Sequence, residues 1–128
     1  MLHAIIDEGR TSCCPESKCF SDFIDWINEA TTNLGLTSKE VYLWGNGILF
    51  DNRIIKNKCK QFGFEYPIYY RNDMDVRTIL ETAAFKEGLS GQIAFRNTVE
   101  HIEPAHNAAI DVKNQIADVC SAYEVLMR

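Results

Sequence analysis

The chain has 128 residues, of which 46% are hydrophobic and 24% are charged. This composition is typical of one globular domain, and it excludes a collagen-like or wholly disordered chain. No apolar run approaches the roughly 20 residues of a membrane-spanning helix, and acidic residues follow Ile6 too soon for a secretory signal. We therefore expect one domain over residues 1–128 of a cytoplasmic protein that makes no contact with a membrane.

The formal net charge of −5 restricts how the chain could act on nucleic acid. A protein that binds nucleic acid only by neutralising phosphates should be basic, so a simple coating protein is disfavoured. A nuclease is compatible with an acidic chain, because carboxylates can bind divalent metal ions that supply the positive charge.

The five cysteines are an odd number, and Cys13, Cys14 and Cys19 crowd into one segment. We expect free thiols rather than a disulfide framework. A zinc site formed by these three cysteines and His3 is an alternative, which the absence of a Cys-x-x-Cys pair disfavours.

The N-terminal third of the chain predicts one helix after an irregular start. Residues 1–10 could form one or two helical turns, and the small polar residues at 11–19 indicate a loop, so residues 1–19 are expected to be irregular. From Phe20, apolar residues recur every three or four positions, which predicts a helix that ends at Gly35.

The middle of the chain predicts a strand, a helix and a second strand. The apolar run at residues 41–44 indicates a strand buried on both faces, which the glycines at 45 and 47 end. A helix is expected over residues 50–62, with Gly63 as its stop. Residues 64–70 surround Pro67 and indicate a short edge strand.

The last third predicts two helices. Asp75 with Thr78 three positions later is a typical helix start, and this helix should end near Gly88. Residues 88–105 have no clear period and indicate a long loop. The final helix should bury a stripe of apolar residues and leave a polar flank exposed. The stripe is Ala109, Val112, Ile116, Val119, Tyr123 and Leu126, and the flank is Asp111, Gln115 and Asp118. The order of elements is that of a helix-rich α/β fold with unusually few strands.

Asp51 is the first candidate for chemistry. The apolar strand breaks at glycines and places Asp51 near the start of a helix, just beyond the carboxyl end of the strand, where α/β sheets hold functional groups. The alternative interpretation is that Asp51 only caps the helix.

His106 and Asp111 form the second candidate. In one continuous helix their five-residue separation would place them about 140° apart. If Asn107 caps the helix instead, His106 lies in the preceding loop and can reach the first turn, which carries Asp111. An imidazole beside a carboxylate suits a general base next to a metal ligand, although a surface or capping histidine is the alternative.

The third candidate segment contains Asp73, Asp75 and Arg77. Capping is the first expectation for Asp75, and a carboxylate pair with Asp73 is the alternative. Arg77 could pair with one of these carboxylates or face a phosphate.

Together, three sequence runs resemble one family. They are Trp-Gly-Asn-Gly-Ile-Leu-Phe-Asp ending at Asp51, Asn-Asp-Met-Asp-Val-Arg-Thr ending at Thr78, and His-Asn-Ala-Ala-Ile-Asp ending at Asp111. In order and spacing they resemble the DEDDh 3′–5′ exonucleases, most closely the phage and prophage group with the exoribonuclease domain of mycobacteria. The resemblance covers about residues 20–128.

This resemblance implies a ribonuclease H-like fold and two Mg²⁺ or Mn²⁺ ions that act on the 3′ end of a single-stranded nucleic acid. It implies that Asp51 and Asp111 bind metal and that His106 is the general base. Asn46, Phe50 and Arg77 would contact the substrate. Whether the substrate is DNA or RNA stays open.

One departure from the family is large. Its first motif, Asp-x-Glu on the opening strand, occurs nowhere in this sequence, and no three-strand meander precedes Phe20. We therefore expect an N-terminally truncated domain with little activity by itself, which associates with its own copies or with a complementary N-terminal chain. The alternatives are a non-catalytic remnant that binds nucleic acid or protein, and an α/β module whose motif matches are chance.

Overall fold

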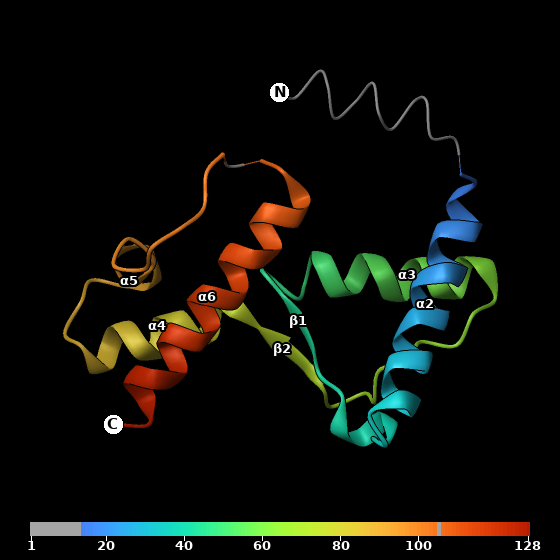
Figure 1. Ribbon diagram of the computed structural model, residues 1–128, viewed down its shortest axis with the longest axis horizontal. Helices are drawn as coiled ribbons and strands as arrows, with labels where there is room; N and C mark the ends of the chain where they lie inside the picture. The colour runs from blue at the N-terminus through green and yellow to red at the C-terminus, as the bar shows by residue number, and fades with distance from the viewer. Residues whose placement is uncertain (1–13, 105) are drawn as a thin grey trace. The chain divides into compact units, whose positions relative to one another are not determined.

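The computed structural model describes residues 14–104 and 106–128 (Figure 1). The chain forms two compact units, which we call the first unit, up to Met74, and the second unit, Asp75–Arg128. The expectations about residues 1–13, including the zinc site with His3 and Cys13, fall outside the described residues. The four described cysteines are free. Among the described helices, none is long and apolar enough to cross a membrane.

The first unit begins with helix α2, Glu16–Asn33. It starts four residues before Phe20, so the expected irregular structure is wrong for residues 16–19. Glu16 lies at the positive end of the helix dipole, and the ion pair between Lys18 and Asp22, at 2.7 Å, supports the first turns. The helix ends as expected, with Gly35 in the left-handed region at φ 67°.

The sheet of the described chain is a parallel pair, β1 (Leu43–Gly45) and β2 (Asp73–Asp75). The expected strand at 41–44 is therefore shifted and shorter, and it is not buried on both faces, since Tyr42 is 53% exposed. The side chain of Asn72 donates hydrogen bonds to the carbonyls of Lys39 and Val41, at 2.8 and 2.9 Å. A side chain thus takes the place of a neighbouring strand ahead of β1.

The edge strand expected within residues 64–70 is wrong. This segment has no regular secondary structure and connects α3 to β2. Pro67 has no N–H to donate to a ladder, and the side chain of Tyr66 bonds to Asp73 instead of standing in a sheet.

The helix expected after the glycine-rich turn is confirmed as α3, Asp51–Phe62. It ends at Gly63, whose φ of 73° is the left-handed conformation that glycine adopts readily. α3 packs against α2 and β1. Cys59 and Asn52 are its buried residues, and the rings of Phe20 and Phe62 lie 6.1 Å apart between the helices.

The second unit contains α4 (Val76–Lys86), α5 (Gln92–Arg96) and α6 (Ala108–Leu126). α4 begins as expected, because the Asp75 carboxylate accepts the backbone N–H of Thr78. α5 corrects the expectation of an unstructured loop at 88–105. Its first N–H, on Gln92, donates to the carboxylate of Glu81 at 2.8 Å, so a distant side chain stabilises this short helix.

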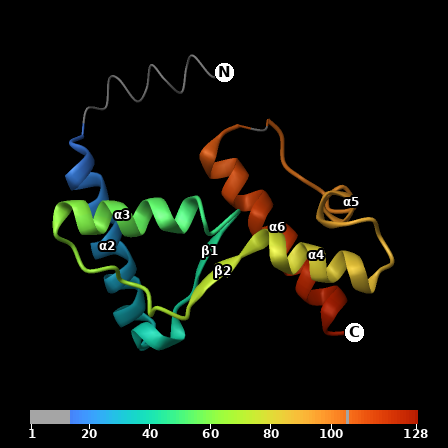
Figure 2. The ribbon, with the colours of Figure 1, turned by 180° about the vertical axis from the view of Figure 1, so that it is seen from behind.

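α6 exists where the sequence predicts it, but it packs through a different face. α4 and α6 lie against each other in both views (Figure 1 and Figure 2). The buried residues of α6 are Asp118, Ala122 and Val125, whereas Val112 and Ile116 of the expected stripe are 54% and 56% exposed. Small side chains are fully buried in both helices, Ala122 in α6 and Ala83 and Ala84 in α4.

Candidate functional site

Asp51 is the first residue of α3, directly after the turn that follows β1. Phe50 occupies the N-cap position, so the capping interpretation of Asp51 is wrong. A Cβ atom on Gly45 would lie 3.2 Å from the Cβ of Asp51 and 2.2 Å from Oδ1 of Asn52. Only glycine therefore lets the start of α3 approach the end of β1 this closely.

The carboxylate of Asp51 has no hydrogen-bond or ion-pair partner within the described residues. Its neighbour Asn52 is 2% exposed and lies in a hydrogen-bonded cluster centred on Asp73. We call Asn52, Lys56, Tyr66 and Asp73 the Asp73 cluster.

The carboxylate of Asp73 accepts three side-chain donors. Oδ1 accepts from Asn52 at 2.9 Å and from the hydroxyl of Tyr66 at 2.7 Å, and Oδ2 pairs with Lys56. The ammonium of Lys56 also lies over the ring of Tyr66, 5.0 Å from its centroid. The cluster joins α3, the connection after it and β2.

The cluster shifts two pKa values. Burial would by itself raise the pKa of the Asp73 carboxyl, but the hydrogen bonds that it accepts and the charge of Lys56 outweigh burial, so its pKa is below the ordinary value. Burial raises the pKa of Tyr66 above its ordinary value, and the hydrogen bond to Asp73 raises it further. Both groups thus keep the protonation states in which tyrosine donates and carboxylate accepts.

His106 and Asp111 come together in the second unit, as the capping hypothesis predicts. Asn107 caps α6 by accepting the N–H groups of Ala109 and Ile110 at 3.1 and 3.3 Å. The backbone N–H of His106 donates to Oδ1 of Asp111 at 3.2 Å. His106 is exposed and has a φ of 69°, a conformation that is uncommon for residues other than glycine.

The residues expected at the substrate are divided between the two units. Asn46 is half-buried and Phe50 is 70% exposed, and both belong to the first unit with Asp51. Arg77 is exposed in the first turn of α4, in the second unit with His106 and Asp111. The structure thus gives the local geometry of each half of the expected site.

Asp73 and Asp75 do not form the carboxylate pair that was the alternative expectation, because each carboxylate has its own partners. Asp73 is the acceptor of its cluster, and Oδ2 of Asp75 accepts the N–H and the hydroxyl of Thr78 at 3.2 and 2.7 Å. The capping expectation for Asp75 is confirmed.

The described residues supply single metal ligands rather than a complete metal site. No three His, Cys, Asp or Glu side chains of residues 14–104 and 106–128 are grouped so as to hold a metal ion. Mg²⁺ binds through one or two carboxylates together with water and substrate phosphates. The carboxylate of Asp51, which has no partner among residues 14–104 and 106–128, fits one such ligand position. The carboxylate of Asp111, whose Oδ1 accepts the backbone N–H of His106, fits another.

Sequence reasoning missed the Asp73 cluster. Asn52 and Lys56 are four residues apart and share a face of α3, which is a detectable signal. That both reach Asp73, which lies 21 and 17 residues away in the sequence, follows only from the fold.

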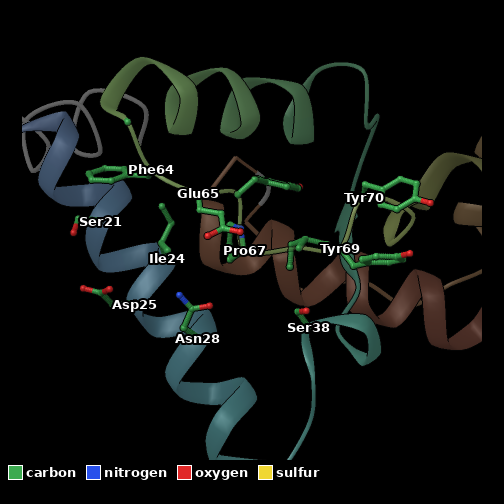
Figure 3. Close-up of a pocket in the computed structure, with 13 residues that line it drawn as sticks. Ser21, Ile24, Asp25, Asn28, Ser38, Phe64, Glu65, Pro67, Tyr69 and Tyr70 are labelled. Carbon is green, nitrogen blue, oxygen red and sulfur yellow. The ribbon is translucent and has the colours of Figure 1, made fainter.

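A pocket of about 620 Å³ lies between α2 and the connection that follows α3, and sequence reasoning did not predict it (Figure 3). Asp25 and Glu65 are among the residues that line it. Carboxylates repel phosphate, so this pocket does not suit the backbone of a nucleic acid. Its lining is Ser21, Ile24, Asp25, Asn28, Ser38, Gly63, Phe64, Glu65, Tyr66, Pro67, Ile68, Tyr69 and Tyr70.

The helix-rich, mixed α/β architecture with a small parallel sheet is consistent with an exonuclease domain. The family model described as the 3′–5′ exoribonuclease Rv2179c-like domain matches residues 3–123. The chain therefore belongs to the Rv2179c-like family of 3′–5′ exoribonuclease domains. Neither the curated proteins nor the solved structures include a match to it.

Proposed function

We propose that the chain is the metal-binding and general-base part of a DEDDh 3′–5′ exonuclease of the phage and prophage group, with a ribonuclease H-like fold. The complete exonuclease hydrolyses phosphodiester bonds at the 3′ end of single-stranded RNA or DNA. The observation that carries this proposal is the family match over residues 3–123, which includes every residue of the candidate site.

Asp51 and Asp111 each provide one carboxylate to a pair of Mg²⁺ or Mn²⁺ ions in this proposal. Such ions, when bound, activate a water molecule and stabilise the leaving 3′ oxygen. The imidazole of His106 takes the proton of the attacking water. The hydrogen bond from its backbone to Asp111 supports this role, because it holds His106 next to the carboxylate that would bind metal.

Asn46, Phe50 and Arg77 contact the substrate in this proposal. The exposed ring of Phe50, next to Asp51 in the sequence, suits stacking on a terminal base. The exposed guanidinium of Arg77 suits a phosphate.

We further propose that the chain by itself has little activity. Two closely spaced ions need several carboxylates, and the sequence contains no Asp-x-Glu to complete the set. The missing acids come from a complementary polypeptide that carries an Asp-x-Glu motif.

Degradation of 5′-labelled single-stranded RNA and DNA tests the proposal. We expect shortening from the 3′ end in Mg²⁺ or Mn²⁺, and none in EDTA, when the chain is co-expressed with a complementary polypeptide that carries an Asp-x-Glu motif. The chain by itself should be weakly active or inactive. Cleavage that persists in EDTA contradicts the metal dependence, and strong cleavage by the pure chain contradicts the need for further acids.

The lack of a three-donor metal site in the described residues favours a second candidate, a remnant that binds nucleic acid without hydrolysing it. Fluorescence anisotropy with the same labelled strands distinguishes the two functions. Binding without cleavage in every combination, in the presence of Mn²⁺, supports the remnant.

A further inference from the structure

We propose that Asn52 and Asp73 are positioning residues that fix the Asp51 carboxylate at the end of β1 for metal binding. This inference rests on the proposed role of Asp51 as a metal ligand. It assigns no metal contact to Asp73 itself.

Asn52 is anchored on both sides. Its side-chain amide donates to the backbone carbonyl of Leu43 in β1, at 3.2 Å, and to Oδ1 of Asp73 in β2, at 2.9 Å. Its own Oδ1 packs against Gly45, where even a methyl group would collide. One buried amide thus ties the first turn of α3 to both strands of the sheet.

Asp51 directly precedes Asn52 in that first turn. Because adjacent residues of a helix share a rigid backbone, the anchored amide of Asn52 fixes the Cα and Cβ atoms of Asp51. It thereby restricts the positions that the Asp51 carboxylate can reach. Residues that orient a metal ligand without touching the metal ion commonly change metal affinity when they are mutated.

Asp73 is itself held by the rest of its cluster. Its side chain is 12% exposed, and Tyr66 and Lys56 donate to it from two other places in the fold. These donors occupy both carboxylate oxygens, whereas Asp51 has no partner among the described residues. This contrast assigns different roles to the two carboxylates: Asp51 binds metal, and Asp73 accepts hydrogen bonds.

Mn²⁺ titrations followed by NMR test these roles of Asp51 and Asp73 without relying on activity. Mn²⁺ broadens amide signals near its binding site, so the signals of residues 45–47 report on metal at Asp51 even when binding is weak. The variants are Asp51→Asn, Asp73→Asn and Asp73→Ala, each with a thermal melt. Asp73→Asn is the matched comparison, because an asparagine keeps an acceptor for Asn52 and Tyr66 but is a poor metal ligand.

We expect Asp51→Asn to abolish selective broadening at the Mn²⁺ concentrations that broaden the signals of the parent. Asp73→Ala should raise the Mn²⁺ concentration needed for half-broadening by about tenfold or more, whereas Asp73→Asn should stay within about threefold of the parent. Should Asp73→Ala fail to fold, Asn52→Ala breaks the same link from the other end and should give the same loss.

Each other outcome has a separate meaning. If the parent shows no selective broadening, or Asp51→Asn keeps it, the proposed metal-binding role of Asp51 fails and this inference with it. If Asp51→Asn loses it but folded Asp73→Ala does not, only the positioning role is overturned. If Asp73→Asn loses it as fully as Asp51→Asn, Asp73 is a ligand and the inference is wrong.

Discussion

His106 has a left-handed backbone at a position where the proposed chemistry needs an imidazole. A non-glycine residue pays about 1–2 kcal/mol for this conformation, and here the N–H of His106 bonds to Asp111. Such strain is often found at functional sites. The pair of variants His106→Ala and His106→Gly separates the backbone from the side chain.

We predict that both variants lose roughly 10² to 10⁴ in the hydrolysis rate of the active assembly, because both remove the general base. Only His106→Ala keeps the backbone strain, so His106→Gly should be the more stable by about 1 kcal/mol. Single-turnover rates and urea midpoints measure the two effects. A rate equal to that of the parent for either variant would remove His106 from the mechanism.

The low pKa of Asp73 predicts a pH dependence of stability. A carboxyl whose pKa is lower in the folded chain than in the unfolded chain stabilises the fold above its unfolded pKa, near 3.9. That stability is lost as the pH falls from about 4 through the folded pKa. The parent should therefore lose more stability than Asp73→Asn between about pH 5 and pH 2.5. Urea midpoints across this range measure the difference, and parallel curves for the two proteins would contradict it.

At the scale of elements, a clamp holds the segment before α6 against that helix. Asp118 is 2% exposed and pairs with Nε of Arg96 at 2.9 Å and with Nε2 of His101 at 2.7 Å. Four residues earlier, Asn114 accepts the N–H and donates to the carbonyl of Ile102, at 2.8 and 3.0 Å. The clamp fixes the path of the chain toward His106.

We predict that Asp118→Ala lowers the free energy of unfolding by about 2 kcal/mol, the range for hydrogen bonds to a charged group. Thermal melts or urea unfolding measure this loss. Glu124→Ala is the matched control, because Glu124 is exposed on the same helix and should change stability by less than about 0.5 kcal/mol. Equal stability of the two variants would mean that the clamp contributes nothing.

Helix ends could be predicted from the sequence because their causes are local. Gly63 ends α3, and Asp75 and Asn107 cap the helices that follow them, each through groups within a few residues. α5 could not be predicted, because its first N–H bonds to Glu81, which is 11 residues away. The buried face of α6 was mispredicted because an aspartate that has two side-chain partners, Arg96 and His101, can be buried where a lone one cannot.

The candidate site divides in the same way. The contact between the backbone of His106 and Asp111 follows from the cap at Asn107, which was one of the two arrangements that the spacing left open. The surroundings of Asp51 needed the fold, since they depend on Asp73 reaching α3 across a long separation in the sequence. The roles of these residues in metal binding and catalysis stay predictions.

At the scale of the whole molecule, α6 carries a stripe of exposed apolar side chains. Val112, Ile116, Tyr123 and Met127 are all exposed, and their spacing places them along one side of the helix. Monomers rarely expose contiguous apolar surface of this kind. The described sheet is also small, with two strands of three residues each, and the edges of a sheet invite pairing with another chain.

We predict that the chain by itself self-associates through this stripe, and that a complementary chain carrying Asp-x-Glu restores a compact, Mg²⁺-responsive domain. The variant Ile116→Glu should shift the chain toward the monomer, because a charge in an apolar interface opposes its burial. Lys113→Glu is the control, since Lys113 is exposed and outside the stripe. Sedimentation at several concentrations measures the shift. A parent that stays monomeric at every concentration, melts cooperatively and binds no hydrophobic dye would contradict the prediction, because the stripe would then need no partner.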